Sequence, residues 1–199
     1  SEPVAPLLWK ADTYHYATRL AMHGGVVAAV AESTTQPHRV ITHERLSTDV
    51  WDLTGVLESP DTAHAGQFGR AVSVHGQSVL VGAGGPDSGM AYLFSKDSFE
   101  WRQEPTFTPA AQSSLGTAVA LGDGLAVLGV PQARLMRTMV RQNAVWVPGP
   151  EIAPAGAPPG LGSALALSGE TLVSGGDGVV FIHAREKGVW TQQARLTPP

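Results

Sequence analysis

Short runs of apolar residues, either alternating with polar ones or continuous, fill most of the chain and are separated by glycine-rich turns. Residues 69–107 show the pattern most clearly: "GRAVSV", "MAYLFSK" and "WRQEPTF" alternate, whereas "SVLVG" is continuously apolar. Alternation with a period of two indicates a strand with one buried face, and a short continuous apolar run indicates a strand covered on both faces. This stretch therefore predicts four consecutive antiparallel strands, with a tight turn at Gly76 between the first two.

The same unit recurs along the chain. Openings similar to "FGRAVSVHGQSVLVG" start at Tyr16, Phe68, Leu115 and Leu161. Each copy then carries a tryptophan, followed six positions later by an apolar residue; the tryptophans are Trp51, Trp101, Trp146 and Trp190. A repeat of about 45 residues that reads as four strands has the size of a β-propeller blade. We therefore predict an all-β fold, a β-propeller of four-stranded antiparallel blades, with the repeat tryptophan packed between neighbouring blades.

The repeat also sets the expected organisation of the chain. The predicted blades cover residues 15–58, 67–108, 114–153 and 160–197. Residues 3–11 resemble an additional outer strand, because the spacing from Leu8 to Tyr16 matches that from Phe107 to Leu115. Four blades and a surplus strand fit three arrangements: part of a larger propeller, a ring completed by two chains, or a small four-bladed ring with the extra strand on an edge.

Composition removes several classes of function. The formal net charge is −4 and only 15% of the residues are charged, which gives no general attraction to nucleic acid or to anionic membranes. The chain has no cysteine, so disulfides and thiolate chemistry are excluded. There is no run of 18 apolar residues, and we therefore expect no membrane insertion.

The glycine-rich stretch "VGAGGPDSG", residues 81–89, raises the question of a dinucleotide cofactor. In a dinucleotide site such a loop opens a helix whose N-terminus holds the pyrophosphate. Here the following "MAYLFSK" predicts a strand, and the third glycine at the fingerprint spacing is missing. We therefore expect no cofactor. The motifs G-x-S-x-G and H-E-x-x-H and the Walker loop are absent as well, which leaves common nucleophilic and nucleotide chemistry without support.

The repeat resembles the FG-GAP repeat of integrin α-chain propellers and of many bacterial secreted proteins. The residues that carry the resemblance are the pairs Phe68-Gly69, Leu115-Gly116 and Leu161-Gly162 and the glycines Gly82, Gly129 and Gly175 of the second strands. The first copy is weaker, because Ala17 replaces the motif glycine and Val30 the strand glycine. The resemblance implies a β-propeller with a binding role, located outside the cell or on its surface.

The chain departs from the integrin-type repeats in one respect that concerns metals. Those repeats often hold calcium in an acidic loop between the first two strands. The corresponding turns here, "HGG", "HGQ", "GDG" and "SGE", are too short and contain too few carboxylates to supply six or more oxygens. His23 and His75 share one position just before a turn glycine, which favours a role in the turn over zinc binding. We expect no metal site.

A ligand site is expected on the propeller face that carries the loops between second and third strands and the linkers between blades. The candidate ligand-binding residues on that face are Glu32, His38, Asp87, Arg134, Arg137 and Asp177. Glu58 and Asp61 are further acids of this face, and two of its carboxylates could hydrolyse a glycosidic bond if they lay about 5 Å or about 6.5–9.5 Å apart. Arg134 and Arg137, together with Arg141, have no acid close in sequence and suit an acidic glycan or an acidic partner.

These observations lead to one principal hypothesis and two alternatives. The principal one is a non-catalytic binding or adhesion module, extracellular or at the cell surface, that recognises a glycan or a protein through its loop face. The first alternative is a structural segment of a larger secreted or surface assembly. The second is a polysaccharide hydrolase or lyase on a propeller scaffold, in which Glu32, Asp87 and Asp177 converge. Partners other than the ligand would be a second copy or another chain that completes the ring.

Overall fold

The computed structural model describes residues 14–85, 89–104, 106–108 and 114–199. Throughout these residues the fold is all-β, with four antiparallel sheets of four strands each and no helix. In every sheet the strands follow one another in chain order, each paired to the next. The predicted fold class, a β-propeller type built of four-stranded antiparallel blades, is therefore confirmed. The strand-like segment predicted at residues 3–11 lies outside the described residues.

The first blade consists of β1 (His15–His23), β2 (Val26–Glu32), β3 (Arg39–Ser47) and β4 (Val50–Glu58). The second consists of β5 (Ala71–His75), β6 (Ser78–Gly84), β7 (Gly89–Lys96) and β8 (Trp101–Gln103). The third consists of β9 (Val119–Gly122), β10 (Leu125–Val130), β11 (Leu135–Gln142) and β12 (Val145–Pro148). The fourth consists of β13 (Ala164–Ser168), β14 (Thr171–Gly176), β15 (Val179–Glu186) and β16 (Val189–Leu196).

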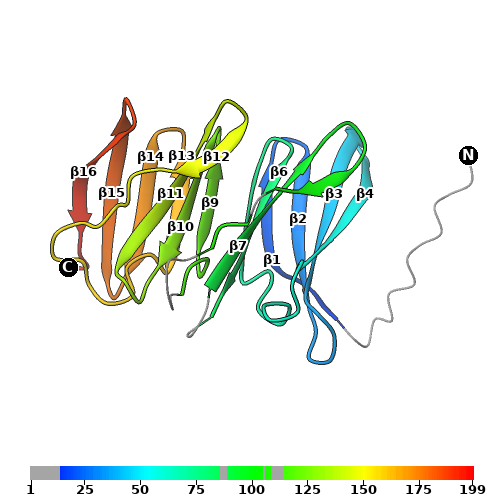
Figure 1. Cartoon of the computed structure of the whole chain (residues 1–199), viewed down its shortest axis with the longest axis horizontal. Coiled ribbons are helices and arrows are strands. Elements are labelled where there is room, and N and C mark those ends of the chain that lie inside the picture. Colours follow the sequence, from blue (N-terminus) through cyan, green and yellow to red (C-terminus); the bar gives the residue numbers. More distant parts are fainter. Residues whose placement is uncertain (1–13, 86–88, 105, 109–113) are drawn as a thin grey trace, which may run out of the picture.

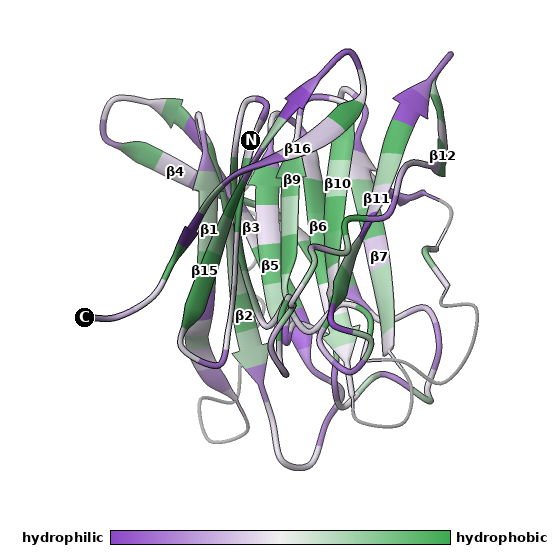
Figure 2. Cartoon of the chain, turned by 90° about the vertical axis from the view of Figure 1, so that its left-hand side faces the viewer, coloured by the Kyte–Doolittle hydropathy of each residue, from purple (hydrophilic) through white to green (hydrophobic). Residues whose placement is uncertain are grey.

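The four blades stand side by side in an open row (Figure 1). Their innermost strands pack in sequence, β1 on β5, β5 on β9 and β9 on β13. The first blade ends the row on one side and the fourth blade ends it on the other (Figure 1). Seen from the fourth-blade end, hydrophobic residues concentrate in the strands and hydrophilic ones in many of the loops (Figure 2). Each blade is thus covered by its neighbours, except on the two outward-facing sides of the row.

The core consists of three clusters, one at each junction between blades. Alternation along the second strands builds them, because successive side chains of a strand point to opposite faces. Val79 and Val81 of β6 pack at the junction with the first blade, and Leu80 between them packs at the junction with the third. This explains the continuously apolar second strands, which are covered on both sides.

The two glycines of the repeat motif bring neighbouring blades into close backbone contact. A Cβ placed on Gly82 would overlap the carbonyl oxygen of Gly116, and one placed on Gly129 would overlap that of Gly162. Gly116 and Gly162 also adopt φ angles of +82° and +91°, a region that side chains other than glycine rarely enter. The motif therefore marks the seam where the second strand of one blade meets the entry turn of the next.

The repeat tryptophans lie at the first or second residue of the outer strands. Trp101, Trp146 and Trp190 are partly buried, and each packs against the core cluster at the junction with the preceding blade. Trp51 belongs to the first blade, which has no preceding blade in the described residues, and it is more exposed. The outer strand of the second blade, β8, ends at Gln103 and is therefore shorter than the predicted "WRQEPTF".

Candidate functional site

The loops between second and third strands adjoin the linkers between blades, so that both contribute to one face. The backbone N–H of His38 donates to the carbonyl oxygen of Ala65 at 3.1 Å, and that of Gln132 donates to the Ser114 hydroxyl at 3.2 Å. His38 and Gln132 belong to loops within a blade, whereas Ala65 and Ser114 belong to linkers. We call the surface formed by these segments the loop face.

Two of the predicted ligand-binding residues are engaged in contacts within the chain. Glu32 ends β2 and is ion-paired with Arg19 of β1. The two ring nitrogens of His38 lie 3.2 Å from the carbonyl oxygens of Phe68 and Ser33, respectively. The His38 imidazole therefore ties the first linker to the loop of the first blade. In this arrangement His38 stabilises the loop face by holding two of its segments together.

The remaining loop residues are spread along the row. Arg134 is exposed at the end of the turn between β10 and β11, with φ +56°. Asp177, with φ +33°, occupies the turn between β14 and β15. Asp87 lies outside the described residues. Glu32 and Asp177 belong to blades at opposite ends of the row, with two sheets about 10 Å apart between them (Figure 1). They do not form the close carboxylate pair that glycoside hydrolysis requires.

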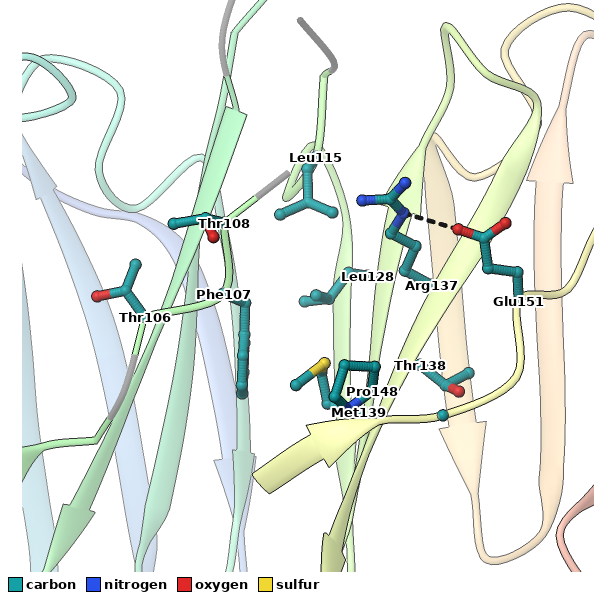
Figure 3. A pocket seen from close by; sticks show the side chains of 11 residues that line it. Thr106, Phe107, Thr108, Leu115, Leu128, Arg137, Thr138, Met139, Pro148 and Glu151 are labelled. Atoms are coloured by element: carbon teal, nitrogen blue, oxygen red, sulfur yellow. Dashed lines mark hydrogen bonds and ion pairs between the residues drawn. The ribbon is translucent and has the colours of Figure 1, made fainter. Parts of the chain in front are cut away.

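Arg137 lies in a pocket between the second and third blades (Figure 3). The pocket has a volume of about 260 Å³, and Phe107, Leu115, Leu128 and Met139 supply its apolar lining. The side chains of Thr106, Thr108, Thr138, Arg137 and Glu151 supply its polar lining.

An ion pair crosses one side of this pocket. Nε of Arg137 donates to Oε1 of Glu151 at 3.0 Å, and both side chains are partly exposed (Figure 3). The isolated bridge between Met136 and Ile152 explains the contact, since it places the neighbouring residues Arg137 and Glu151 side by side. Arg137 has no acid close in sequence, but the fold supplies one from the linker after β12.

The pocket combines chemical features typical of a small-molecule site: an apolar lining with a few polar groups at its edges. The Arg137 guanidinium carries further N–H donors beyond its bond to Glu151, Glu151 accepts, and threonine hydroxyls can do both. The volume falls just below the roughly 300 Å³ at which drug-sized sites begin. The pocket therefore suits one small polar group better than a large ligand.

Asp61 is the centre of a second polar cluster, which sequence reasoning considered only as one of several loop acids. Its carboxylate accepts from the Tyr92 hydroxyl at 2.5 Å and from the backbone N–H of His64 at 2.9 Å. The His64 ring nitrogen Nδ1 lies 2.9 Å from the same carboxylate. Burial acts to raise the pKa of Asp61, but the hydrogen bonds from Tyr92 and His64 outweigh it, so that this pKa lies below its ordinary value.

The pKa of the Tyr92 hydroxyl is shifted in the opposite direction. Burial and the hydrogen bond to the Asp61 carboxylate both raise the pKa of Tyr92 far above its ordinary range. Tyr92 is therefore a permanent donor, and Asp61 is an acceptor held in its charged form. Because every donor comes from the chain itself, this cluster anchors the first linker to the second blade.

We expect Tyr92→Phe to reduce stability at neutral pH and to weaken its dependence on pH. The hydrogen bond to a partly exposed carboxylate is worth about 1–2 kcal/mol of unfolding free energy. A carboxyl whose folded-state pKa is lowered stabilises the protein above its unfolded pKa near 4 and loses that contribution as the pH falls further. Urea unfolding at pH 7 and pH 3 measures both effects. The matched variant Tyr14→Phe, at an exposed hydroxyl that donates to Pro37, should keep the wild-type pH profile.

Two negative observations concern the described part of the chain. Within it, no group of three or more histidine, aspartate or glutamate side chains is placed so that it could hold a metal ion. Nor does this part contain a helix of sufficient length and hydrophobicity to span a membrane.

Comparisons with known proteins relate these features to a family. A family model described as the FG-GAP repeat matches residues 51–94. This stretch begins in the outer strand of the first blade and ends in the third strand of the second, so that the sequence unit straddles a junction between blades. A search of curated protein sequences found no match.

Several solved structures share the fold at low sequence identity. A protein from Lactobacillus plantarum is 13% identical, with a TM-score of 0.60, over 88% of this chain and 53% of that one. A putative 6-phosphogluconolactonase from Bacteroides uniformis is also 13% identical, with a TM-score of 0.59, over 90% of this chain and 56% of that one. The Aleuria aurantia lectin, solved with α-methyl-L-fucoside, is 11% identical, with a TM-score of 0.51, over 94% of this chain and 61% of that one.

The chain thus spans little more than half the length of the two bacterial proteins that it resembles. The likeness covers nearly all of this chain and is a likeness of propeller-type fold. Together with the family match and the seam formed by the motif glycines, it identifies the repeat on both sequence and structure: the chain carries an FG-GAP repeat within a β-propeller-type fold.

Proposed function

We propose that this chain is a non-catalytic binding module, extracellular or at the cell surface, that recognises a glycan. The observation that carries the proposal is the pocket between the second and third blades, with its apolar lining and its Arg137–Glu151 pair. A sugar residue offers hydroxyls that both donate and accept and C–H faces that pack against apolar side chains. The pocket offers the matching set: guanidinium donors, a carboxylate acceptor, threonine hydroxyls and an apolar lining.

The comparisons lend support from two directions. A propeller-type neighbour is a lectin solved with a fucoside, and FG-GAP repeats are typical of extracellular proteins. The size of the pocket suits one residue of a longer glycan, whose other residues would extend along the loop face near Arg134. Within the chain, Glu32 and Asp177 lie at opposite ends of the row (Figure 1) and do not form a pair, which weakens the hydrolase alternative, while Asp87 lies outside the described residues.

The test is binding of the purified chain to an array of neutral, fucosylated and acidic oligosaccharides, followed by titration with the best binder. We expect Arg137→Ala to weaken that binding about tenfold or more, because a charge-assisted hydrogen bond is worth about 1.5–3 kcal/mol. Arg102→Ala is the matched control, since Arg102 pairs with Asp97 on an exposed hairpin away from the pocket. Equal binding by both variants, or no binding by the wild type, would contradict the proposal.

A structural role in a larger assembly is the second candidate function. The observation that favours it is the exposure of large apolar side chains at both ends of the row. In that case the glycan array stays blank, while the end faces still mediate association.

A further inference from the structure

The outward faces of the first and fourth blades correspond to the two sides of a junction between blades, but no blade of the described chain packs against them. We propose that a second copy of this chain covers both ends, with the first blade of each copy packed on the fourth blade of the other. Two head-to-tail contacts then close a two-chain ring. The inference does not depend on the proposed glycan site.

In the first blade, the position of the motif residues is exposed instead of buried in a junction. The residues at the corresponding position of the other blades, Phe68, Leu115 and Leu161, are at most 1% exposed, and each packs in a junction. Tyr16 holds this position in the first blade and is 56% exposed. Ala17, in place of the motif glycine, keeps the unusual φ of the motif, +61°. The first blade therefore carries the motif position of an ordinary junction, here within β1, without a blade to receive it.

The strand glycine of the fourth blade lacks the close backbone neighbour of its counterparts. Gly82 and Gly129 are needed because the backbone of the following blade lies against them. Gly175 holds the same repeat position, but its nearest neighbour to an added Cβ is the Ala164 Cβ at 3.6 Å, an ordinary contact. Its φ lies outside the range that requires glycine. Gly175 therefore occupies the position of a seam glycine, but within the described chain no backbone of a following blade lies against it.

Apolar residues in the outer strands or in the linkers just after them show the same difference between junctions and free ends. Leu57, Phe107 and Ile152 pair with the third strand of their blades and are at most 5% exposed, because the following blade covers them. Leu196 pairs with Val180 in the same way and is 51% exposed. Val189 of the same strand is exposed too, as are Leu20, Met22 and Trp51 in the first blade. Apolar patches of this kind mark interaction surfaces.

A second copy is the occupant that these surfaces fit, because both complementary faces belong to this one chain. Each face continues a packing mode that already occurs three times within it. Four blades make up little more than half of the bacterial propeller-type chains, so that two copies approach a whole ring. Eight blades lie within the usual range of four to eight. Because head-to-tail contacts either close or grow into filaments, the ring also predicts a fixed stoichiometry.

Light scattering of the purified 199-residue chain tests the stoichiometry, and we expect the mass of two chains. Gly175→Val should reduce the mass to that of one chain and leave the circular dichroism spectrum unchanged. Gly66→Val is the matched control, since a Cβ added at Gly66 meets no atom within 4 Å. A wild-type mass of one chain at all concentrations would overturn the proposal, as would assemblies larger than two.

Cross-linking tests the orientation even if Gly175→Val does not fold. The Leu121 N–H donates to the Ser73 hydroxyl at 3.0 Å across the junction of the second and third blades. The corresponding residues at the free ends are Met22 and Ala166. Because the chain has no cysteine, the double variant Met22→Cys/Ala166→Cys is expected to form a covalent two-chain species on oxidation. Each single variant should remain uncrosslinked. A cross-link in Met22→Cys alone would mean that like ends meet, and a ladder of longer species would mean an open filament; both exclude the ring.

Discussion

Gly129→Ala is expected to lower the free energy of unfolding by about 3 kcal/mol, although it adds a single methyl group. A Cβ at this position overlaps the carbonyl oxygen of Gly162, which belongs to the entry turn of the fourth blade. The obstacle is backbone and cannot rotate away as a side chain could. The fourth blade must therefore move outward, which opens the third junction around Leu161 and Leu172.

Urea unfolding followed by tryptophan fluorescence measures this loss, since Trp190 lies at the same junction. Gly66→Ala is the control, because it makes the same change where no atom lies within 4 Å and φ is not positive. It should stay within about 0.5 kcal/mol of the wild type. If the two variants were equally stable, the close approach of the third and fourth blades would not be a determinant of the fold.

The fold could be predicted because its signals are local or periodic. Alternation, turn glycines and the spacing of the tryptophans each report on a few neighbouring residues, and fourfold repetition reinforces every one of them. The motif glycines could be interpreted as well, because a glycine at the end of an apolar strand is typical of a place where another backbone approaches closely. Closure of the ring could not be predicted in this way. Whether the first and fourth blades meet depends on the angles between neighbouring blades, summed over three junctions, and no single repeat determines that sum.

The polar contacts of the candidate sites could not be predicted in the same way. The Arg137–Glu151 pair depends on the register between β11 and the linker beyond β12, and Tyr92 reaches Asp61 across a blade boundary. One usable signal existed for the first pair. The apolar residue six positions after each tryptophan pairs with the third strand, so that its neighbour Glu151 had to lie near that strand. No comparable rule places a linker acid such as Asp61.

Phe68→Ala is expected to cost about 3–5 kcal/mol of unfolding free energy, the range for removing a fully buried aromatic side chain. Phe68 is completely buried at the first junction, with its ring centre 5.7 Å from that of Tyr92 and 6.1 Å from that of Phe94. Its carbonyl oxygen also lies 3.2 Å from Nδ1 of His38, so that the motif residue holds both the core and the loop face of this junction.

Phe99→Ala provides the same substitution at a side chain that is 87% exposed on the hairpin between β7 and β8, and it should change stability by no more than about 0.5 kcal/mol. Thermal unfolding of both variants measures the contrast. A large loss for Phe68 and none for Phe99 would show that the blades are stabilised by burial at their junctions, where each motif residue enters the preceding blade. Comparable losses for the two variants would mean that stability arises within single sheets and not at the junctions. Burial of the end faces against a partner would then add no stability.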